Sequence, residues 1–304
     1  MKKTAGAILI SLMAAFPPLG NASASELDLA SKWAPVHYQD TDSTDYDADY
    51  LTAANFDGDW NMRNNWENQS QDLRKLKGSA YYSVSETETH WFVIYSFYHP
   101  RDWTDYPDFV LDTHENDLEG AMMIVRKDGS PSGSLEGMVT VFHNHFYSYT
   151  PAGSPLTDGE ENIDGTIQMT DGRPATFQEA KGHGLKAWDG KEFPGGDGVI
   201  YKPAGEGSVP SSGNGRNAAY KLISVMEPDG LWDRRNNSET YASFGTFAGD
   251  NGKDNAANAP WGWDDSDDSP GRGAMALDPA ALTDAYFDGL GAFSRNYAVN
   301  PYQE

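Results

Sequence analysis

Near-continuous apolar runs separated by short polar segments dominate the middle of the chain, and this pattern predicts paired β-strands. Residues 81–98 predict one hairpin, whose second strand starts at His90 and is expected to end before Pro100, because proline cannot donate to a sheet. Residues 118–125 and 135–146 predict a second hairpin. Because these runs are apolar at nearly every position, we expect central strands that are covered on both faces.

The end of the chain carries the clearest helix signal. Asp278 is a favourable N-cap, Pro279 occupies the preferred first helical position, and apolar residues recur at helical spacing up to Phe293. Before this helix, shorter strands are predicted over 174–180 and 195–201, separated by long loops rich in glycine, aspartate and asparagine. The pattern as a whole predicts a mainly β fold, namely a single β-sandwich with long loops and a C-terminal helix.

The first 24 residues have the features of a secretory signal peptide. Two lysines precede an apolar stretch at 5–16, which is too short to span a bilayer, and Ala-Ser-Ala at 22–24 fits the cleavage rule. We therefore expect residues 1–24 to be removed and the protein to be secreted, to the periplasm or the extracellular space. Residues 25–304 show no break in composition and are expected to form one domain.

Composition narrows the functional classes. The 304-residue chain contains no cysteine, which excludes thiol catalysis, thiolate metal sites and disulfide bonds. Its formal net charge of −24 at pH 7 argues against nucleic acid and anionic membranes as electrostatic partners and is compatible with cation binding. No later stretch approaches the length of an apolar membrane-spanning helix, so no transmembrane segment is expected in the mature chain.

Four side chains that suit a divalent cation flank the loop between the two predicted hairpins. Asp102 follows the strand that starts at His90, whereas His114, Asp117 and Glu119 come before or at the start of the next strand. If these strands are antiparallel neighbours, their connected ends meet and the four side chains lie together. His114 is three residues from Asp117, so it is expected in a bent loop rather than on the straight strand. Three carboxylates and one imidazole suit calcium, magnesium or manganese better than structural zinc.

The spacing of these four residues is equally compatible with hydrogen-bonded turns that hold no ion. A further loop has Asp57, Asp59 and Asn61 at the alternating spacing of a calcium loop, but it lacks the later glycine and glutamate of a complete EF-hand. An ordinary Asx turn is the preferred interpretation of that second loop, with a calcium site as the alternative.

The motif around the four residues resembles that of a known family. Tyr-Ser-Phe-Tyr-His-Pro-Arg-Asp at 95–102, followed by His-x-x-Asp-x-Glu at 114–119, is similar to the signature of the necrosis- and ethylene-inducing peptide-like proteins, which are secreted cytolysins. The resemblance implies an activity against membranes. It also implies that the family's metal ligands fall on Asp102, His114, Asp117 and Glu119.

The sequence departs from that family pattern at several points. The loop before the histidine is longer, Asn116 replaces a histidine, and Leu118 replaces a tryptophan. The two cysteines found in many members are absent. These departures leave the four proposed ligands in place. They weaken the case for a cytolytic activity.

A second resemblance covers about residues 31–190. Trp-Ala-Pro-Val-His-Tyr at 33–38 is similar to the opening of the vacuolar-protein-sorting-associated family of fungi and bacteria, and segments at 114–119, 139–145 and 173–184 match its later elements. The two families share the His-x-x-Asp-x-Glu cation motif, so we treat them as one broad superfamily. Bacterial members of the second family are largely without assigned activity.

Two further histidines are candidates for proton transfer. His183 lies between two glycines and His145 lies near a predicted strand end, so either could act as a general base on a metal-bound water. The alternative is that both are hydrogen-bonded structural residues at strand ends. Neither a Gly-x-Ser-x-Gly elbow nor a His-Glu-x-x-His motif is present, which excludes the common serine-hydrolase and zincin classes.

Three functions follow from these residues. In the first, the cation site of a secreted β-sandwich engages a lipid head group or an extracellular glycan, Trp261 and Trp263 supply exposed apolar contacts, and the resemblance extends the activity to cytolysis. In the second, the protein is a secreted metal-dependent hydrolase. In the third, ions only stabilise the fold. The sequence leaves open whether the protein is an enzyme.

Overall fold

The computed structural model describes residues 25–105, 113–191 and 193–303, and most of their regular structure is strand. The strands are β1 (Val36–Asp40), β2 (Ser79–Thr87), β3 (His90–Asp102), β4 (His114–Arg126), β5 (Ser134–Phe142), β6 (His145–Thr150), β7 (Thr157–Asp158), β8 (Ile163–Thr166), β9 (Met169–Thr170), β10 (Arg173–Gln178), β11 (Leu185–Ala187), β12 (Gly198–Pro203), β13 (Ala218–Ser224), β14 (Tyr241–Ser243), β15 (Thr246–Phe247), β16 (Phe287–Asp288) and β17 (Tyr297–Val299). The α-helices are α1 (Glu26–Trp33), α2 (Asn65–Asn68), α3 (Ala274–Leu277) and α4 (Pro279–Tyr286).

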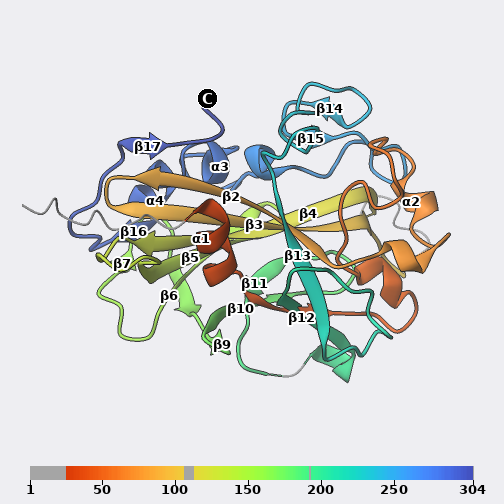
Figure 1. Ribbon diagram of the computed structural model, residues 1–304, viewed down its shortest axis with the longest axis horizontal. Coiled ribbons are helices and arrows are strands. Elements are labelled where there is room, and N and C mark those ends of the chain that lie inside the picture. Colours follow the sequence, from red (N-terminus) through yellow and green to blue (C-terminus); the bar gives the residue numbers. More distant parts are fainter. Residues whose placement is uncertain (1–24, 106–112, 192, 304) are drawn as a thin grey trace, which may run out of the picture.

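One large mixed sheet organises these elements (Figure 1). Within the described residues, 13 strands join in it, in the order β11-β10-β1-β12-β13-β2-β3-β4-β5-β6-β8, with β9 on β10 and β17 on β2. The sheet curls back on itself, so that β11, at one end, lies against β4 and β5. The mainly β prediction is therefore confirmed. A single β-sandwich is not confirmed, since the main strands form one continuous, curled sheet rather than two separate layers.

Both predicted hairpins are present, with two corrections. β3 does not end before Pro100 but continues to Asp102. Pro100 is tolerated because the register pairs His99 with Asp117 and Arg101 with Glu115, which leaves the proline opposite an irregular position of β4. The predicted strand over 135–146 is interrupted by a tight turn between β5 and β6, where His143 has a φ of 58°.

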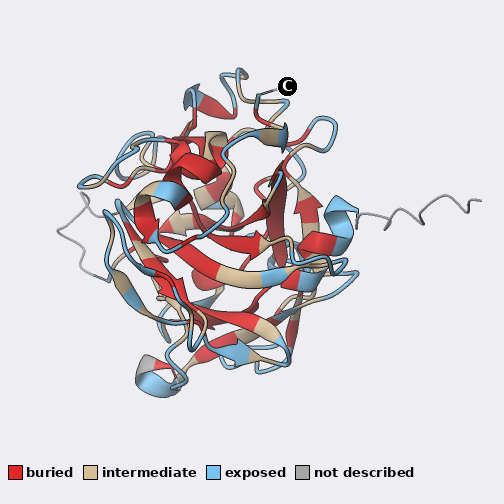
Figure 2. Cartoon of the chain, turned by 90° about the vertical axis from the view of Figure 1, so that its left-hand side faces the viewer, coloured by how far each residue is buried: buried red, intermediate tan, exposed pale blue. Residues whose placement is uncertain are grey.

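The central hairpin is buried as its composition predicts. β3 and β4 are each 13 residues long and pair from His90 opposite Arg126 to Asp102 opposite His114. Nearly every side chain along both strands is buried, including Phe92. Buried residues fill the centre of the molecule and exposed residues mark the outer loops (Figure 2).

Alternation along β1 separates two environments. Val36 and Tyr38 pack into a small apolar cluster, while His37 and Gln39 face the opposite way, where they are fully buried. Gln39 Oε1 lies 3.0 Å from Nε2 of His99 on β3, so the inside of the curled sheet contains polar side chains as well as aromatic ones.

The C-terminal helix is confirmed at its beginning and is shorter than expected at its end. The Asp278 side chain accepts a hydrogen bond from the N–H of Ala281, and Pro279 is the first helical residue. The helix stops at Tyr286, where the chain turns into β16. Apolar residues beyond that point, such as Phe293, pack on the core from the segment between β16 and β17.

The signal peptide predicted for residues 1–24 lies outside the described residues. Among the helices that the structure describes, none has the length and apolar character needed to cross a bilayer.

Candidate metal and ligand site

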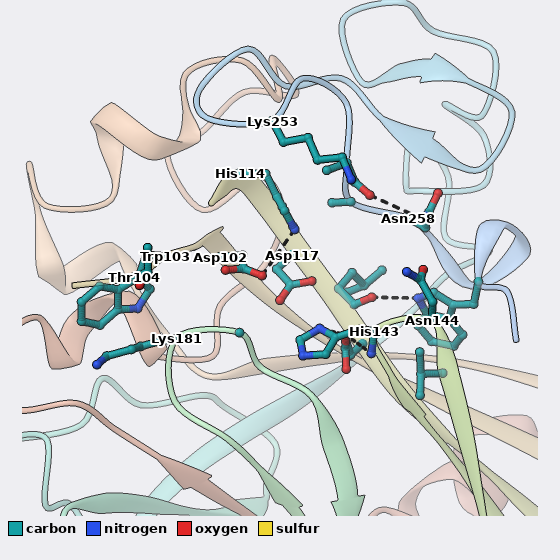
Figure 3. Close-up of a pocket in the computed structure, with 17 residues that line it drawn as sticks. Asp102, Trp103, Thr104, His114, Asp117, His143, Asn144, Lys181, Lys253 and Asn258 are labelled. Carbon is teal, nitrogen blue, oxygen red and sulfur yellow. Dashed lines mark hydrogen bonds and ion pairs between the residues drawn. The ribbon is translucent and has the colours of Figure 1, made fainter. Parts of the chain in front are cut away.

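A cavity of about 520 Å³ opens where β3 ends and β4 begins. Asp102, His114, Asp117 and Glu119, the four residues predicted as metal ligands, all line it. Figure 3 shows the side chains of Asp102, Asp117 and His114 directed toward the same space, with His143 and Asn144 on the other side. The structure therefore brings these four residues to one cavity, and their role as metal ligands stays a prediction.

Strand pairing brings the first two residues together. Asp102 and His114 face each other in the last pair of the β3–β4 register. The His114 Nε2 atom lies 3.4 Å from Asp102 Oδ2, and His114 Nδ1 lies 2.8 Å from the carbonyl oxygen of Asn116. The carbonyl contact fixes the ring, so that its other nitrogen points toward the Asp102 carboxylate.

A left-handed residue explains how His114 and Asp117 share the cavity although they are three residues apart. Asn116 has a φ of 62°, which breaks the alternation of β4 between the two. His114 is thus part of the strand and not of a preceding loop, which corrects the expectation from the sequence.

The buried side chain of Asn116 holds this kink in place. Its Oδ1 accepts hydrogen bonds from the Tyr98 hydroxyl at 2.6 Å and from Asn65 at 3.0 Å. Its amide donates to the carbonyl oxygens of Met62 at 2.8 Å and Ala248 at 3.0 Å. Four hydrogen bonds to a fully buried side chain define one backbone geometry at this position.

Asp117 is tied to the interior through His183. The His183 ring is fully buried, with Nδ1 3.0 Å from Asp117 Oδ2 and Nε2 3.1 Å from Asp49 Oδ1. Burial alone would lower the pKa of His183, but the two carboxylates raise it to about 10. The ring is therefore an imidazolium at neutral pH and compensates two buried negative charges.

Glu119 connects β4 to two other segments. Its Oε1 accepts from the backbone N–H of His143 at 2.7 Å, and its Oε2 accepts from the N–H of Leu185 at 3.1 Å. The His143 ring sits between carboxylates, with Nδ1 3.3 Å from Glu119 and Nε2 3.2 Å from Glu179. Burial opposes its charge, but these carboxylates raise the pKa of His143 to about 11.

The carboxyl groups of the cavity are poorly solvated. Burial, with a further contribution from the Asp117 carboxylate, raises the pKa of Asp102 to about 8. Burial likewise raises the pKa of Glu119 to about 7, against the opposing effect of His143. Both carboxyl groups would be stabilised as anions by an additional positive charge in the cavity.

The donor set fits a divalent cation in its chemistry. Asp102, Asp117, Glu119 and His114 would hold it, and carboxylate oxygens are the ligands that calcium, magnesium and manganese prefer. Within the described residues, however, no three of these four side chains bring their ligand atoms within 4.8 Å of one another. The groups of three that do so in the described part of the chain involve other side chains near Asp265.

The two histidines predicted as catalytic lie elsewhere. His183 is behind the cavity wall, and both its ring nitrogens are engaged by carboxylates. His145 is half exposed and lies 3.2 Å from Asp267, outside the residues that line the cavity. Their catalytic roles stay predictions. Besides His114, the histidine that lines the cavity is His143.

The predicted exposure of two tryptophans is wrong. Trp261 and Trp263 are 1% and 3% exposed. Trp263 lines the cavity wall, where its Nε1 donates to the carbonyl oxygen of Leu118 at 2.7 Å, and Trp261 packs among other aromatic rings. Neither side chain therefore forms an apolar patch on the outer surface.

The loop with calcium-like spacing uses its oxygens internally. Asp57 Oδ1 accepts from the N–H of Asp59, and Asp59 Oδ1 accepts from the N–H of Asn61. The remaining Asp57 oxygen accepts from the amide of Asn68 at 2.7 Å. These are the contacts of consecutive Asx turns.

Sequence reasoning missed several residues of the site. Asp49, in the 3₁₀ helix η1 (Tyr46–Asp49), accepts hydrogen bonds from Trp103 Nε1 at 3.0 Å and from the Lys181 N–H at 2.9 Å, in addition to His183. Lys181, Lys253 and Trp103 also line the cavity. No local motif marks Asp49, Lys181 and Lys253, because they come from segments far from the β3–β4 connection, and Trp103, although it directly follows Asp102, belongs to no recognisable motif.

Comparisons with known proteins find distant structural likeness and no sequence match. No family model matches the chain, and no curated protein matches it. Necrosis and Ethylene inducing Protein 2 from the causal agent of cocoa's witches' broom disease is 16% identical, over 73% of this chain and 85% of that one, with a TM-score of 0.38. The non-toxic HaNLP3 protein is 15% identical, over 74% and 85% of the two chains, with a TM-score of 0.38.

A complex of NLPPya with mannosamine is 14% identical, over 90% of this chain and 94% of that one, with a TM-score of 0.42. The resemblance to the vacuolar-protein-sorting-associated family finds no support in these comparisons. At these TM-scores the likeness assigns no activity, so the function of this chain has to be argued from its own cavity.

Proposed function

We propose that this protein is secreted, binds one divalent cation through Asp102, His114, Asp117 and Glu119, and uses the cavity around the ion to engage a lipid head group or an extracellular glycan. The observation that carries the proposal is the convergence of these four side chains on one cavity at the β3–β4 junction. The sequence motif that led to them also suggests that binding ends in membrane damage.

The polar content of the cavity supports a cation. Asp102 and Glu119 are 8% and 4% exposed, and their negative charges are costly in such surroundings without a cation. His183 and His143 compensate part of this charge from the inner wall. A bound cation would supply the rest and would present a positive centre to an anionic or hydroxyl-rich ligand.

The cavity rim supports a polar ligand. Lys253 lines the cavity, and Asn258 and Thr104 add hydrogen-bonding groups (Figure 3). Lys181 lines it as well, but its ammonium group is paired with Asp42 and Asp105. Ammonium groups suit the phosphate of a lipid head group, and amide, hydroxyl and carboxylate groups suit the hydroxyls of a sugar.

A metal-dependent hydrolase is the second candidate. It requires a base in the cavity that can take a proton from water. The cavity histidine nearest to the acidic groups, His143, has both ring nitrogens against carboxylates, and His183 is enclosed by two more. We therefore prefer the ligand-binding function to the hydrolase. A measurement of substrate turnover decides whether the protein is an enzyme.

Calorimetric titration with calcium, magnesium and manganese tests the cation site. We expect Asp117→Asn and Asp102→Asn to weaken binding at this site about tenfold or more, because each removes a carboxylate ligand. Asp284→Asn, an exposed carboxylate on α4, is the matched control and should bind as the unmodified protein does. Equal cation affinity in Asp117→Asn and the control would remove the basis of the proposal.

Leakage from vesicles and binding to immobilised glycans then test the ligand. Cation-dependent leakage or glycan retention that is lost in Asp117→Asn supports the proposal. Turnover of ester or phosphodiester substrates that is lost in His143→Ala or His183→Ala, while circular dichroism shows that the variant is still folded, supports the hydrolase instead. If chelation lowers the melting temperature while no vesicle, glycan or substrate responds, the ion serves only the fold.

A further inference from the structure

A second acidic cluster lies outside the cavity, in the loop that follows Trp263. In the described part of the chain, two groups of three side chains have ligand atoms that all lie within 4.8 Å of one another, and both contain Asp265. The members of these groups are His145, Asp265 and Asp267 in one, and Glu161, Asp265 and Asp268 in the other.

The burial of Asp265, the residue that both groups share, distinguishes this cluster from an ordinary acidic surface. Asp265 is only 5% exposed. Its Oδ2 accepts a hydrogen bond from the Tyr286 hydroxyl at 2.7 Å, whereas its Oδ1 is buried without a hydrogen-bond partner. A buried carboxylate oxygen without a partner is costly, and buried charges are normally paired or bound to a metal.

Among the side chains that the structure describes, no lysine or arginine neutralises the negative charge of this cluster. Among the described residues, no lysine or arginine forms an ion pair with Glu161, Asp265 or Asp268, and the exposed imidazole of His145 reaches Asp267 at 3.2 Å. Three further carboxylates, those of Glu161, Asp267 and Asp268, thus lie close to the Asp265 carboxylate.

The surrounding backbone already holds the contributing segments together. The Glu160 N–H donates to the carbonyl oxygen of Ala285 at 2.8 Å, and the Ser269 hydroxyl donates to Glu160 at 2.7 Å. The Ser266 N–H donates to the Asn144 carbonyl oxygen at 2.9 Å. The loop, the β7–β8 connection, the start of β6 and the end of α4 therefore meet at one place, on the side of the molecule where Figure 1 shows β6, β7 and α4.

We propose that Asp265 is the central ligand of a second divalent-cation site, specific for calcium, with Glu161 and Asp268 as its further carboxylate ligands. An all-oxygen set of this kind suits calcium, which accepts irregular geometry and carboxylates in one- or two-oxygen modes. The ion gives Asp265 Oδ1 its missing partner and fastens the acidic loop to the β7–β8 connection, which itself contacts the end of α4. The site is independent of the cavity at the β3–β4 junction, because none of its residues lines that cavity.

Terbium luminescence detects the site directly. Tyr286 donates to Asp265, so an ion at this place lies beside an aromatic side chain that can sensitise terbium when it is excited. We expect calcium-displaceable emission from the full mature chain. It should be retained in Asp117→Asn and reduced, with calcium affinity about tenfold or more weaker, in Asp265→Asn and Asp268→Asn. Asp264→Asn is the matched control, since it lies in the same loop but in neither group.

Thermal unfolding provides the second readout. Asp265→Asn removes the buried charge, so in chelator it should melt at or above the temperature of the unmodified protein, whereas in calcium it should melt below it. This reversal distinguishes a lost ion from a damaged fold. If Asp265→Asn does not fold, Asp268→Asn, which is partly exposed, carries the test. Unchanged emission and an unchanged calcium-induced shift in Asp268→Asn, or equal effects in Asp264→Asn, overturn the proposal, whatever happens at the first site.

Discussion

The imidazole rings of His99 and His183 stack face to face, with their centroids 3.8 Å apart and their planes within 6°. His99 belongs to β3, three residues before the Asp102 end of the strand, and His183 belongs to the turn between β10 and β11. The stack therefore fastens the turn that carries Lys181 to the strand that carries Asp102. Because His183 also joins Asp49 to Asp117, it is a positioning residue for the cation site rather than part of its surface.

Replacing His183 should destabilise the fold strongly. In His183→Ala two buried carboxylates lose their shared cation, and breaking a buried ion pair in this way costs about 3–5 kcal/mol. Urea unfolding, with the linear extrapolation to water, measures this loss. His145→Ala, measured in chelator, is the control because that ring is half exposed, and we expect a change below about 0.5 kcal/mol. A loss of less than about 1 kcal/mol in His183→Ala would contradict the assignment of a buried imidazolium.

Asp40 should make stability depend on pH. Burial raises the pKa of Asp40 from 3.8 to about 7, with a further contribution from Asp49. A raised folded-state pKa means that the neutral acid is favoured by folding, so its contribution is complete below about pH 4 and is lost as the pH rises through 7. Asp40→Asn keeps a neutral side chain at every pH. We expect it to gain about 1–3 kcal/mol on the unmodified protein between pH 4 and pH 8.

The neighbouring Asp42 provides the control for that measurement. Hydrogen bonds from Thr44 lower the pKa of Asp42 to about 2, so its contribution is present above about pH 4 and is lost only as the pH falls toward 2. Asp42→Asn should therefore shift the stability curve without changing its slope between pH 4 and pH 8. Parallel curves for Asp40→Asn and the unmodified protein would show that Asp40 is ionised in the fold.

Asn116 should affect both stability and cation binding. Asn116→Ala removes four hydrogen bonds of a buried side chain and places alanine at a φ of 62°, whereas Asn116→Gly removes the same bonds but tolerates the backbone angle. We expect both variants to lose several kcal/mol, with alanine worse by about 1–2 kcal/mol. In folded Asn116→Gly, cation affinity should fall, because His114 and Asp117 are no longer held on one side. Unchanged affinity would mean that the kink does not position the ligands.

The strong hairpins and the gathering of the four acidic and imidazole residues could be predicted from the sequence, because they depend on neighbouring strands and a short connection. The chain order alone brings Asp102 close to His114. The curled sheet could not be predicted in this way, since it depends on the parallel pairing of β1 with β10 and of β13 with β2, which are far apart in the chain. For the same reason nothing local marks Asp49 as a partner of His183.

The sequence also led to a wrong prediction for Trp263, because contacts with a distant part of the chain determine whether this side chain is exposed. Trp263 lies in a loop rich in aspartate, which favours an exposed position, yet its ring is buried against the strand backbone of β4. The reason is Gly120, whose lack of a side chain leaves room for the ring. A glycine in a central strand indicates close approach of another group, but the sequence does not say which one.

Gly120→Ala should therefore disturb the wall of the cavity. A Cβ atom at this position would collide with the carbonyl oxygen of Tyr95 and with the Trp263 ring. The backbone oxygen is fixed by the sheet, so the strain must move Trp263 or the strand, at a cost of about 1–3 kcal/mol. We expect a lower melting temperature, a change in tryptophan fluorescence and weaker ligand binding at the cavity. Gly165→Ala in β8 is the matched control, because its Cβ would approach nothing closer than the Tyr149 ring at 3.7 Å. If the two variants have the same melting temperature and both retain the native tryptophan fluorescence, the prediction that the Trp263 ring packs directly on Gly120 is wrong.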